Sequence, residues 1–164
     1  MERGGRRNST GSVSRIPNPL DPLYVGPLKR GKRNGNGLYK KGEHLYIGDW
    51  KDGKKHGFGK CVYGGSSFYD GKWYEDCRSG WGEMHYKNGE VYVGDWLMDK
   101  RHGEGIVTYA DGNWYEGEWR FDKKHGQGKL FFADKGQLYC GSWMNGHAQG
   151  GTLRRNIFTE SLTH

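Results

Sequence analysis

Aromatic and polar residues alternate along this chain in a pattern that returns at nearly constant spacing. Each copy opens with Tyr-x-Gly-x-Trp, so an extended strand would place Tyr, Gly and Trp on one face and the intervening residues on the other. The copies begin at tyrosines spaced 22 to 24 residues apart: Tyr24, Tyr46, Tyr69, Tyr92, Tyr115 and Tyr139. A period of this length is typical of stacked structural repeats.

A turn signal follows each strand. Gly or Asp stands three residues after the Trp of each Tyr-x-Gly-x-Trp copy from Tyr46 onward, at Gly53, Asp76, Asp99, Asp122 and Gly146; the corresponding Trp of the last copy is Trp143. Both residue types tolerate left-handed backbone, so we predict that the chain reverses there. On the return strand we expect two glycines, a medium apolar residue and an aromatic residue to share the ring face, as in Gly57, Gly59, Cys61 and Tyr63. Glycine weakens a strand, so its recurrence predicts Tyr and Trp rings lying flat over bare backbone.

The links between copies also contain turn residues. Asn88-Gly89 and Asp111-Gly112 are strong signals for short hairpins. Tight turns at both ends of every strand allow only antiparallel neighbours. The sequence therefore predicts an all-β protein, an elongated single-layer antiparallel meander of stacked β-hairpins that advances about 10 Å per repeat.

The two ends of the chain depart from the repeat. Residues 1–23 are rich in Arg and then in Pro, and we predict a disordered basic tail and a Pro-rich linker. We assign residues 24–152 to the repeat array and 153–164 to a C-terminal cap or tail. In the last copy, Gln149 replaces His and Thr152 stands where the second glycine is expected, as is typical of a capping repeat.

The composition excludes an ordinary globule with a two-layer aliphatic core. Only 33% of the residues are hydrophobic, whereas 15% are aromatic and 30 are glycine. The formal charge of +7 favours an acidic partner or surface. Three cysteines without a CxxC motif, and no apolar segment of spanning length, predict a reduced, cytoplasmic protein.

The full pattern adds a basic pair and His-Gly-x-Gly to Tyr-x-Gly-x-Trp, and it closely resembles the MORN repeat (membrane occupation and recognition nexus). The resemblance spans residues 24–152. It implies elongated single-layer sheets that bind extended partner segments or pair with each other as homodimers. The segments RSGWGEMHY, NGEVYVGDW and DKGQLYCGSW are similar to the short MORN-only proteins of cilia, flagella and sperm. This finer resemblance implies a place in the axoneme or in sperm, at the acrosome among other sites.

The repeated aromatic face is the first candidate binding site. In a single-layer sheet no second layer would cover this face, so an open aromatic trough would bind an extended or helical segment of an axonemal or cytoskeletal protein. The alternative is that the rings fill the trough themselves as a core. The residues concerned are Tyr46, Trp50, Tyr69, Trp73, Tyr92, Trp96, Tyr115 and Trp119.

The basic pairs after the first turn are the second candidate site. In a meander these pairs would fall on one long edge, where we expect them to bind an anionic surface such as phosphoinositide headgroups or an acidic partner. The alternative is that they keep the edge soluble and unpaired. Nucleic acid is not expected, because the rings lie over glycine rather than between the basic side chains. The residues are Lys54, Lys55, Lys100, Arg101, Lys123 and Lys124.

Neither catalysis nor a cofactor is predicted. His56, His102 and His125 recur at one repeat position, but zinc ligands lie about 2 Å from the metal while repeats are about 10 Å apart. We therefore expect the histidines to bond the hairpin turns. No nucleophile, phosphate-loop or metalloprotease motif stands outside the repeats, which predicts a non-enzymatic scaffold. The apolar residue before each leading tyrosine predicts either cross-strand contacts on the opposite face or a second docking strip.

Overall fold

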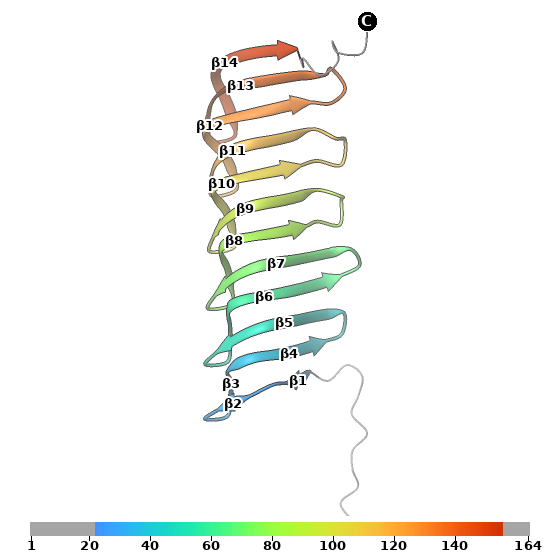
Figure 1. Ribbon diagram of the computed structural model, residues 1–164, viewed down its shortest axis with the longest axis vertical. Helices are drawn as coiled ribbons and strands as arrows, with labels where there is room; N and C mark the ends of the chain where they lie inside the picture. The colour runs from blue at the N-terminus through green and yellow to red at the C-terminus, as the bar shows by residue number, and fades with distance from the viewer. Residues whose placement is uncertain (1–21, 156–164) are drawn as a thin grey trace, which may run out of the picture.

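A computed structural model describes residues 22–155, which form a ladder of hairpins (Figure 1). Consecutive strands are neighbours from β4 to β14, and β1 pairs with β4. Every pairing is antiparallel, so the predicted single-layer meander is confirmed. The described residues include no helix of the length and apolar character needed to cross a membrane. Our predictions for residues 1–21 and 156–164 concern segments outside the described residues.

The strands follow the repeat, two to each copy, apart from a short separate hairpin near the start. The large sheet consists of β1 (Leu23–Val25), β4 (Gly35–Lys41), β5 (His44–Lys51), β6 (Lys54–Gly64), β7 (Ser67–Tyr74), β8 (Cys77–His85), β9 (Val91–Leu97), β10 (Lys100–Thr108), β11 (Trp114–Arg120), β12 (Lys123–Phe132), β13 (Gln137–Met144) and β14 (His147–Arg155). The small hairpin is β2 (Leu28–Lys29) with β3 (Lys32–Arg33).

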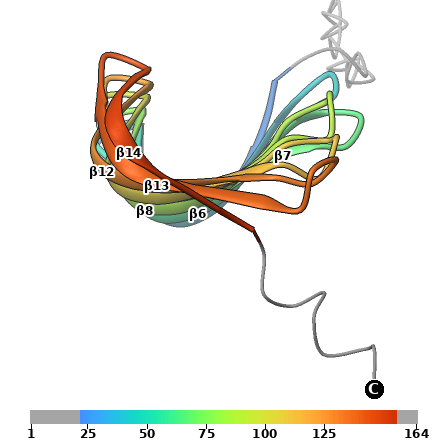
Figure 2. The same ribbon diagram turned by 90° about the horizontal axis from the view of Figure 1, so that it is seen from above.

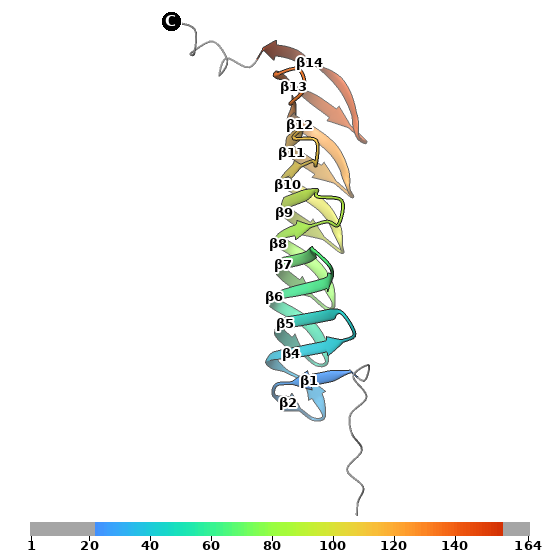
Figure 3. The same ribbon diagram turned by 90° about the vertical axis from the view of Figure 1, so that its right-hand side faces the viewer.

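The sheet is curved like a gutter. Seen along its long axis, both ends of the hairpins rise to the same side of the sheet (Figure 2). From the side the stack remains one sheet thick (Figure 3). One wall carries the turns within each repeat and the other wall carries the links between repeats. The gutter therefore has an inner face, where side chains from both walls converge, and an outer face.

The turn within each repeat is a two-residue reversal in which both residues are left-handed. The φ angles are 51° and 89° at Asp52 and Gly53, and 48° and 65° at Met98 and Asp99. Two positive φ values define the type I′ turn, whose twist matches that of the flanking strands. The predicted reversal is confirmed in all five copies from Tyr46 onward. The bulky residues before each Asp, such as Met98 and Phe121, also adopt this conformation.

Glycine forms the floor beneath each tyrosine ring. Gly48 pairs with Gly59 across two strands, and a Cβ on Gly59 would collide with the Tyr46 ring and hydroxyl. Each repeat from Tyr46 to Tyr115 has the same arrangement. The prediction for Gly57 was wrong, because this residue is left-handed (φ 61°) and its missing Cβ would meet the Asp49 carboxylate on the outer face.

The five tryptophans of the Tyr-x-Gly-x-Trp pattern do not lie flat with the tyrosines, contrary to our expectation. Each stands on edge between two tyrosines, at 82° to 90° to their planes and 5.0 to 5.7 Å from their centres, in an unbroken row from Tyr24 to Tyr139. Edge-to-face packing is the arrangement that the ring quadrupoles favour. The Trp73 indole N–H also donates to the Gly59 carbonyl, 2.8 Å away in the preceding repeat. Each tryptophan thus joins one repeat to the one before it.

The last repeat keeps its glycine floor in a different register. Gly151, not Thr152, pairs with Gly141, and a Cβ on Gly151 would collide with the Tyr139 ring. The cause is a bulge one residue shorter than in the other hairpins, which moves the return strand by one position. Our expectation that Thr152 replaces the floor glycine was therefore wrong.

Candidate functional site

The eight rings predicted to form an open aromatic trough are the core of the protein. Their exposed fractions lie between 0% and 4%. A one-layer sheet can bury rings this completely only on the inside of its curve, so they line the inner face. The rings therefore cannot form the exposed surface that the sequence suggested, and any partner in the gutter would lie on other side chains. The residues are Tyr46, Trp50, Tyr69, Trp73, Tyr92, Trp96, Tyr115 and Trp119.

The basic pairs all follow the turns within the repeats and so lie along one wall, as predicted, but the two members of each pair point to opposite faces of the sheet. The first residue of a pair points outward: the side chains of Lys54 and Lys100 are 51% and 55% exposed. The second covers an indole of the following repeat, as Lys55 does at 4.3 Å from the Trp73 ring centre and Arg101 at 4.5 Å from that of Trp119. Lys124 lies 5.0 Å from the Trp143 ring centre, whereas Lys123 is exposed. These cation–π contacts pack the side chain of the second basic residue against an indole and hold its positive charge on the inner face.

The turn type explains the inward cations and could have revealed them from the sequence. A two-residue turn at Asp52-Gly53 pairs Lys51 with Lys54 and Trp50 with Lys55. Cross-strand partners share a face of the sheet, so Lys55 must lie on the side of Trp50. The same count places Arg78, Arg101 and Lys124 on the inner face.

Opposite the cations, a second row of half-buried tyrosines lines the inner face. Tyr39, Tyr63, Tyr86 and Tyr109 pack against the core. Two hollows open between the rows. One of about 260 Å³ is bounded by Tyr39, Leu45 and Cys61, and one of about 540 Å³ by Tyr86, Met84 and Arg78; both include Lys55 and Tyr63.

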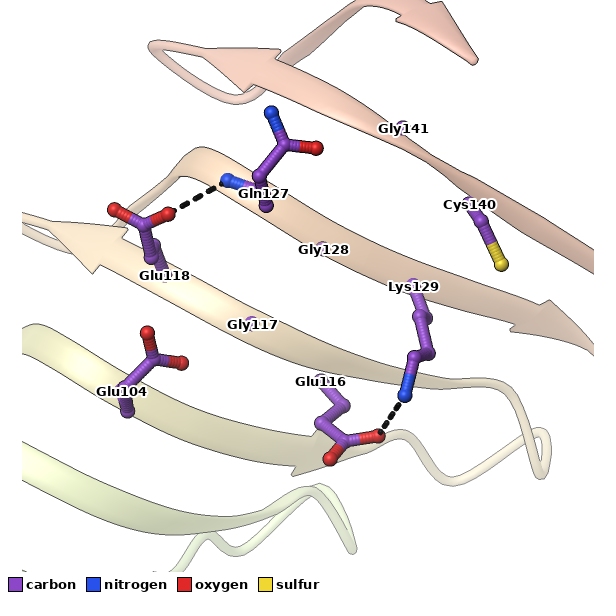
Figure 4. A pocket seen from close by; sticks show the side chains of 9 residues that line it. All are labelled: Glu104, Glu116, Gly117, Glu118, Gln127, Gly128, Lys129, Cys140 and Gly141. Atoms are coloured by element: carbon purple, nitrogen blue, oxygen red, sulfur yellow. Dashed lines mark hydrogen bonds and ion pairs between the residues drawn. The ribbon is translucent and has the colours of Figure 1, made fainter. Parts of the chain in front are cut away.

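The outer face carries a different set of side chains. Toward the C-terminal half it presents Glu104, Glu116 and Glu118 around a shallow hollow of about 350 Å³ (Figure 4). Glu118 accepts a hydrogen bond from the Gln127 main-chain N–H at 2.8 Å, and Glu116 lies 3.5 Å from the Lys129 ammonium. These carboxylates are thus largely engaged within the sheet, and they make this part of the outer face acidic.

Comparison with known protein families finds the MORN repeat at residues 24–42, 46–67, 92–114, 115–137 and 139–150. These segments cover more than half of the chain. The chain belongs to the MORN-repeat family. MORN repeats typically serve as non-catalytic scaffold modules that bind proteins or membranes. A search of curated proteins found no match.

The copy of the MORN repeat at Tyr69 lies outside the matched segments, yet it folds like the others. Ser79 replaces histidine, and Cys77-Arg78 replaces the basic pair. Its tyrosine still lies over Gly71 and Gly82, and Arg78 still covers the Trp96 ring at 4.3 Å. The floor and the inward cation therefore persist where the linear pattern weakens.

At three of the turns, an aspartate links a MORN repeat to the one before it. The Asp99 main-chain N–H donates to the Arg78 carbonyl at 3.1 Å, and the Asp99 carboxylate accepts from the Arg78 main-chain N–H at 3.0 Å. Asp122 makes the same pair of bonds with Arg101. Burial alone would raise the pKa of Asp99 and Asp122, but hydrogen bonds from Arg78, and from Arg101 and Lys100, hold each pKa below its ordinary 3.8.

This linkage predicts loss of stability in acid. Because the folded-state pKa is the lower one, both carboxylates stabilise the fold above about pH 4, and the stabilisation disappears as the pH falls through the folded pKa. Melting temperatures measured by circular dichroism should change little from pH 7 to about pH 5 and fall below about pH 4. The Asp99→Asn, Asp122→Asn double variant should melt lower at pH 7 and show a shallower fall. An equally steep fall in that variant would show that other groups control acid unfolding.

The histidine row packs against aromatic rings rather than bonding the turns. The His56 ring centre lies 5.1 Å from that of Tyr74, and the His102 ring centre 4.9 Å from that of Phe121. Nδ1 of His102 and of His125 is buried without a hydrogen-bond partner among the described residues, so the expected turn bonds are wrong there. Within residues 22–155 no group of three His, Cys, Asp or Glu side chains is placed to hold a metal ion.

Of the apolar residues that precede the leading tyrosines, Phe68 and Trp114 form cross-strand ring contacts. Phe68 stacks on His85 with ring centres 4.2 Å apart, and Trp114 stacks on Phe131 at 5.7 Å. The contact interpretation is therefore confirmed at these two positions. A second docking strip on this face stays a prediction.

Proposed function

We propose that this MORN array is a non-enzymatic scaffold that holds a protein partner along the inner face of its gutter. The observation that carries the proposal is the double lining of that face, with half-buried tyrosines on one wall and cations on the other. No second layer of the described chain covers these groups. The two hollows offer an extended or helical segment places for its side chains.

We further propose that the partner is an axonemal or cytoskeletal protein of a cilium, flagellum or sperm cell. The support is the likeness of RSGWGEMHY, NGEVYVGDW and DKGQLYCGSW to the short MORN-only proteins of those structures. Localising the tagged full chain in ciliated cells and sperm tests this part separately from the binding mode.

Site-specific photo-crosslinking would test the binding mode without disturbing the core. A photo-reactive phenylalanine analogue at position 63 would face the gutter, whereas the same analogue at position 58 would face outward, where Phe58 is 60% exposed. We expect position 63 to crosslink a defined partner in extracts of ciliated cells and position 58 to leave it uncrosslinked. Crosslinking only from position 58 would place the partner on the outer face and contradict the proposal.

Anionic membrane is the competing ligand, through the outward lysines Lys54, Lys100 and Lys123. Two of them are already paired, Lys54 with Glu75 at 3.1 Å and Lys100 with Asp122 at 3.0 Å, which weakens the attraction to a membrane. We expect little co-sedimentation with vesicles containing phosphatidylinositol 4,5-bisphosphate at physiological salt. Strong sedimentation that a Lys54→Glu, Lys100→Glu, Lys123→Glu variant abolishes would favour the membrane function instead.

A further inference from the structure

One ion pair crosses the gutter from wall to wall. Glu90 lies in the link before β9 and Arg101 at the start of β10, at opposite ends of the same hairpin. Their side chains meet at 2.8 Å, and each is only 19% exposed. The guanidinium carbon sits 5.6 Å above the Tyr92 ring centre, so the bridge passes over the inner face. It is a strap across the groove in the middle of the array.

The other repeats lack this strap. The positions equivalent to Glu90 hold His44, Ser67, Asn113 and Gln137. The Ser67 hydroxyl instead donates to the His85 carbonyl at 3.0 Å, and the Asn113 side-chain oxygen accepts from the Ala133 main-chain N–H at 2.7 Å. Within the described repeats the gutter is therefore bridged by an acid–base pair at Glu90 and Arg101 alone. The groove is divided into an N-terminal half and a C-terminal half.

The N-terminal half contains both inner hollows, and Lys55 stands between them. The hollow of about 260 Å³ has a mainly aromatic and aliphatic lining, with Lys41 and Lys55 but no carboxylate. It can take an apolar side chain beside a positive charge. The hollow of about 540 Å³ continues from Lys55 to Arg78, and its two carboxylates, Asp76 and Asp99, accept from the Lys55 main-chain N–H and from Arg78.

Lys55 is a cation held on the inner face without a counterion. Arg78 and Arg101, at the same repeat position, are paired with Asp99 at 2.9 Å and Glu90 at 2.8 Å. Lys55 forms no ion pair within the described chain, and its ammonium lies over the rings of Trp73 and Tyr46. The nearby Asp76 carboxylate accepts from the Lys55 main-chain N–H at 2.8 Å. An ammonium has three donors, and a partly desolvated one gains most from an incoming carboxylate.

We infer that the N-terminal half of the gutter, from Tyr39 to Arg78, binds an extended acidic peptide segment whose carboxylate pairs with Lys55 and whose neighbouring apolar side chain enters the hollow at Tyr39, Leu45 and Cys61. The Glu90–Arg101 strap ends this site. The inference rests on the proposed function. It adds the chemistry of the partner segment, the position of its binding site and the point at which the site ends. An extended chain advances about 3.3 Å per residue and a repeat about 10 Å, so the three repeats before the strap match roughly nine residues.

The test uses the full chain and fluorescein-labelled peptides of about ten residues. Each peptide has a Gly-Ser-Thr background with one Leu and, two to four positions away, one Glu; matched peptides carry Gln or Lys in place of Glu. Fluorescence anisotropy should show that the wild type prefers Glu to Gln by roughly tenfold, which is the effect of one charge-assisted hydrogen bond. The Lys55→Arg variant should keep this preference, and Lys55→Glu should reverse it in favour of the Lys peptide.

Lys124→Glu is the matched control, because Lys124 also lies over aromatic rings, forms no ion pair with any residue from 22 to 155, and lies beyond the strap. Its peptide preference should equal that of the wild type, with circular dichroism confirming that both Glu variants are folded. The inference would be overturned if Lys124→Glu, and not Lys55→Glu, changed the peptide preference. Equal affinity of the wild type for the Glu and Gln peptides would overturn it as well. Binding of no peptide at all would overturn it too.

The strap provides a second measurement. In Glu90→Ala the groove should be open past Arg101, so amide shifts caused by the Glu peptide in nuclear magnetic resonance spectra should extend to residues around Tyr109. In the wild type they should stop before Tyr92. Shifts that cross Tyr92 equally in both proteins would show that the strap does not limit the site. If photo-crosslinking from position 63 succeeds while the peptide series fails, the inner face remains the docking surface and only the acidic-peptide assignment is lost.

Discussion

Replacing Gly105 with alanine should lower the free energy of unfolding by about 3 kcal/mol or more, at the upper end of overpacking effects. The new Cβ would collide with the hydroxyl and ring carbons of Tyr92. That ring cannot move away, because it is fully buried between Trp96 and Trp119 at 5.1 and 5.5 Å. Urea unfolding followed by far-ultraviolet circular dichroism would measure the change as a lowered midpoint.

Gly150→Ala is the matched control for this prediction. Gly150 also lies in a strand of the sheet, but a Cβ there would meet nothing within 4 Å. Its substitution should change the stability by less than about 1 kcal/mol, in either direction. Equal losses at Gly105 and Gly150 would mean that strand entropy, not the space beneath Tyr92, explains the recurring glycines.

The repeat and its hairpins were predictable because their determinants are local. Alternation within Tyr46–Trp50 assigns a face to each residue, and Gly53 or Asp99 marks a reversal a few positions later. Nothing distant has to be known to derive a meander from such units. The family resemblance rests on the same local spacing, which is why the sheet order could be predicted together with it.

The failures arose where one strand depends on its neighbour. Gly57 turns to the outer face because the Asp49 carboxylate, on the preceding strand, fills the space beside it and accepts from the Phe58 N–H at 3.0 Å. The register of Gly151 depends on the length of the bulge in the β13–β14 hairpin, and no single residue of the sequence predicts that length. Both are properties of a strand pair, which a one-strand alternation cannot reveal.

The candidate site was harder to predict than the fold, because it depends on curvature. A flat sheet would keep Glu90 and Arg101 apart, at the two ends of one hairpin. The curved sheet brings them to 2.8 Å and converts two surface charges into a strap. Curvature also buries Tyr92 and the equivalent tyrosines, which are the most regular residues of the repeat. These residues therefore form the core, and the surface left for a partner consists of residues that recur less regularly.

Trp96→Ala should destabilise the protein by about 3 to 5 kcal/mol, the usual cost of removing a buried tryptophan. The ring packs edge-on against Tyr69 at 5.5 Å and Tyr92 at 5.1 Å, and its N–H donates to the Gly82 carbonyl at 3.2 Å. Because these contacts join two successive repeats, their loss should also separate the unfolding of the two halves of the array. Urea titration should show a lower midpoint and a broader transition than in the wild type.

Trp81→Ala separates this core function from partner binding. Trp81 lies on the outer face of the adjoining strand and is 54% exposed, so its removal should change stability by no more than about 0.5 kcal/mol. A Trp96→Ala protein that unfolds like the wild type would contradict the coupling of the repeats through tryptophan. Since the predicted cost of Trp96→Ala is a large part of the stability of a typical domain, loss of a partner in that variant would report unfolding rather than contact. Binding in the gutter must therefore be tested at Lys55 and Tyr63, which border the groove without forming its floor.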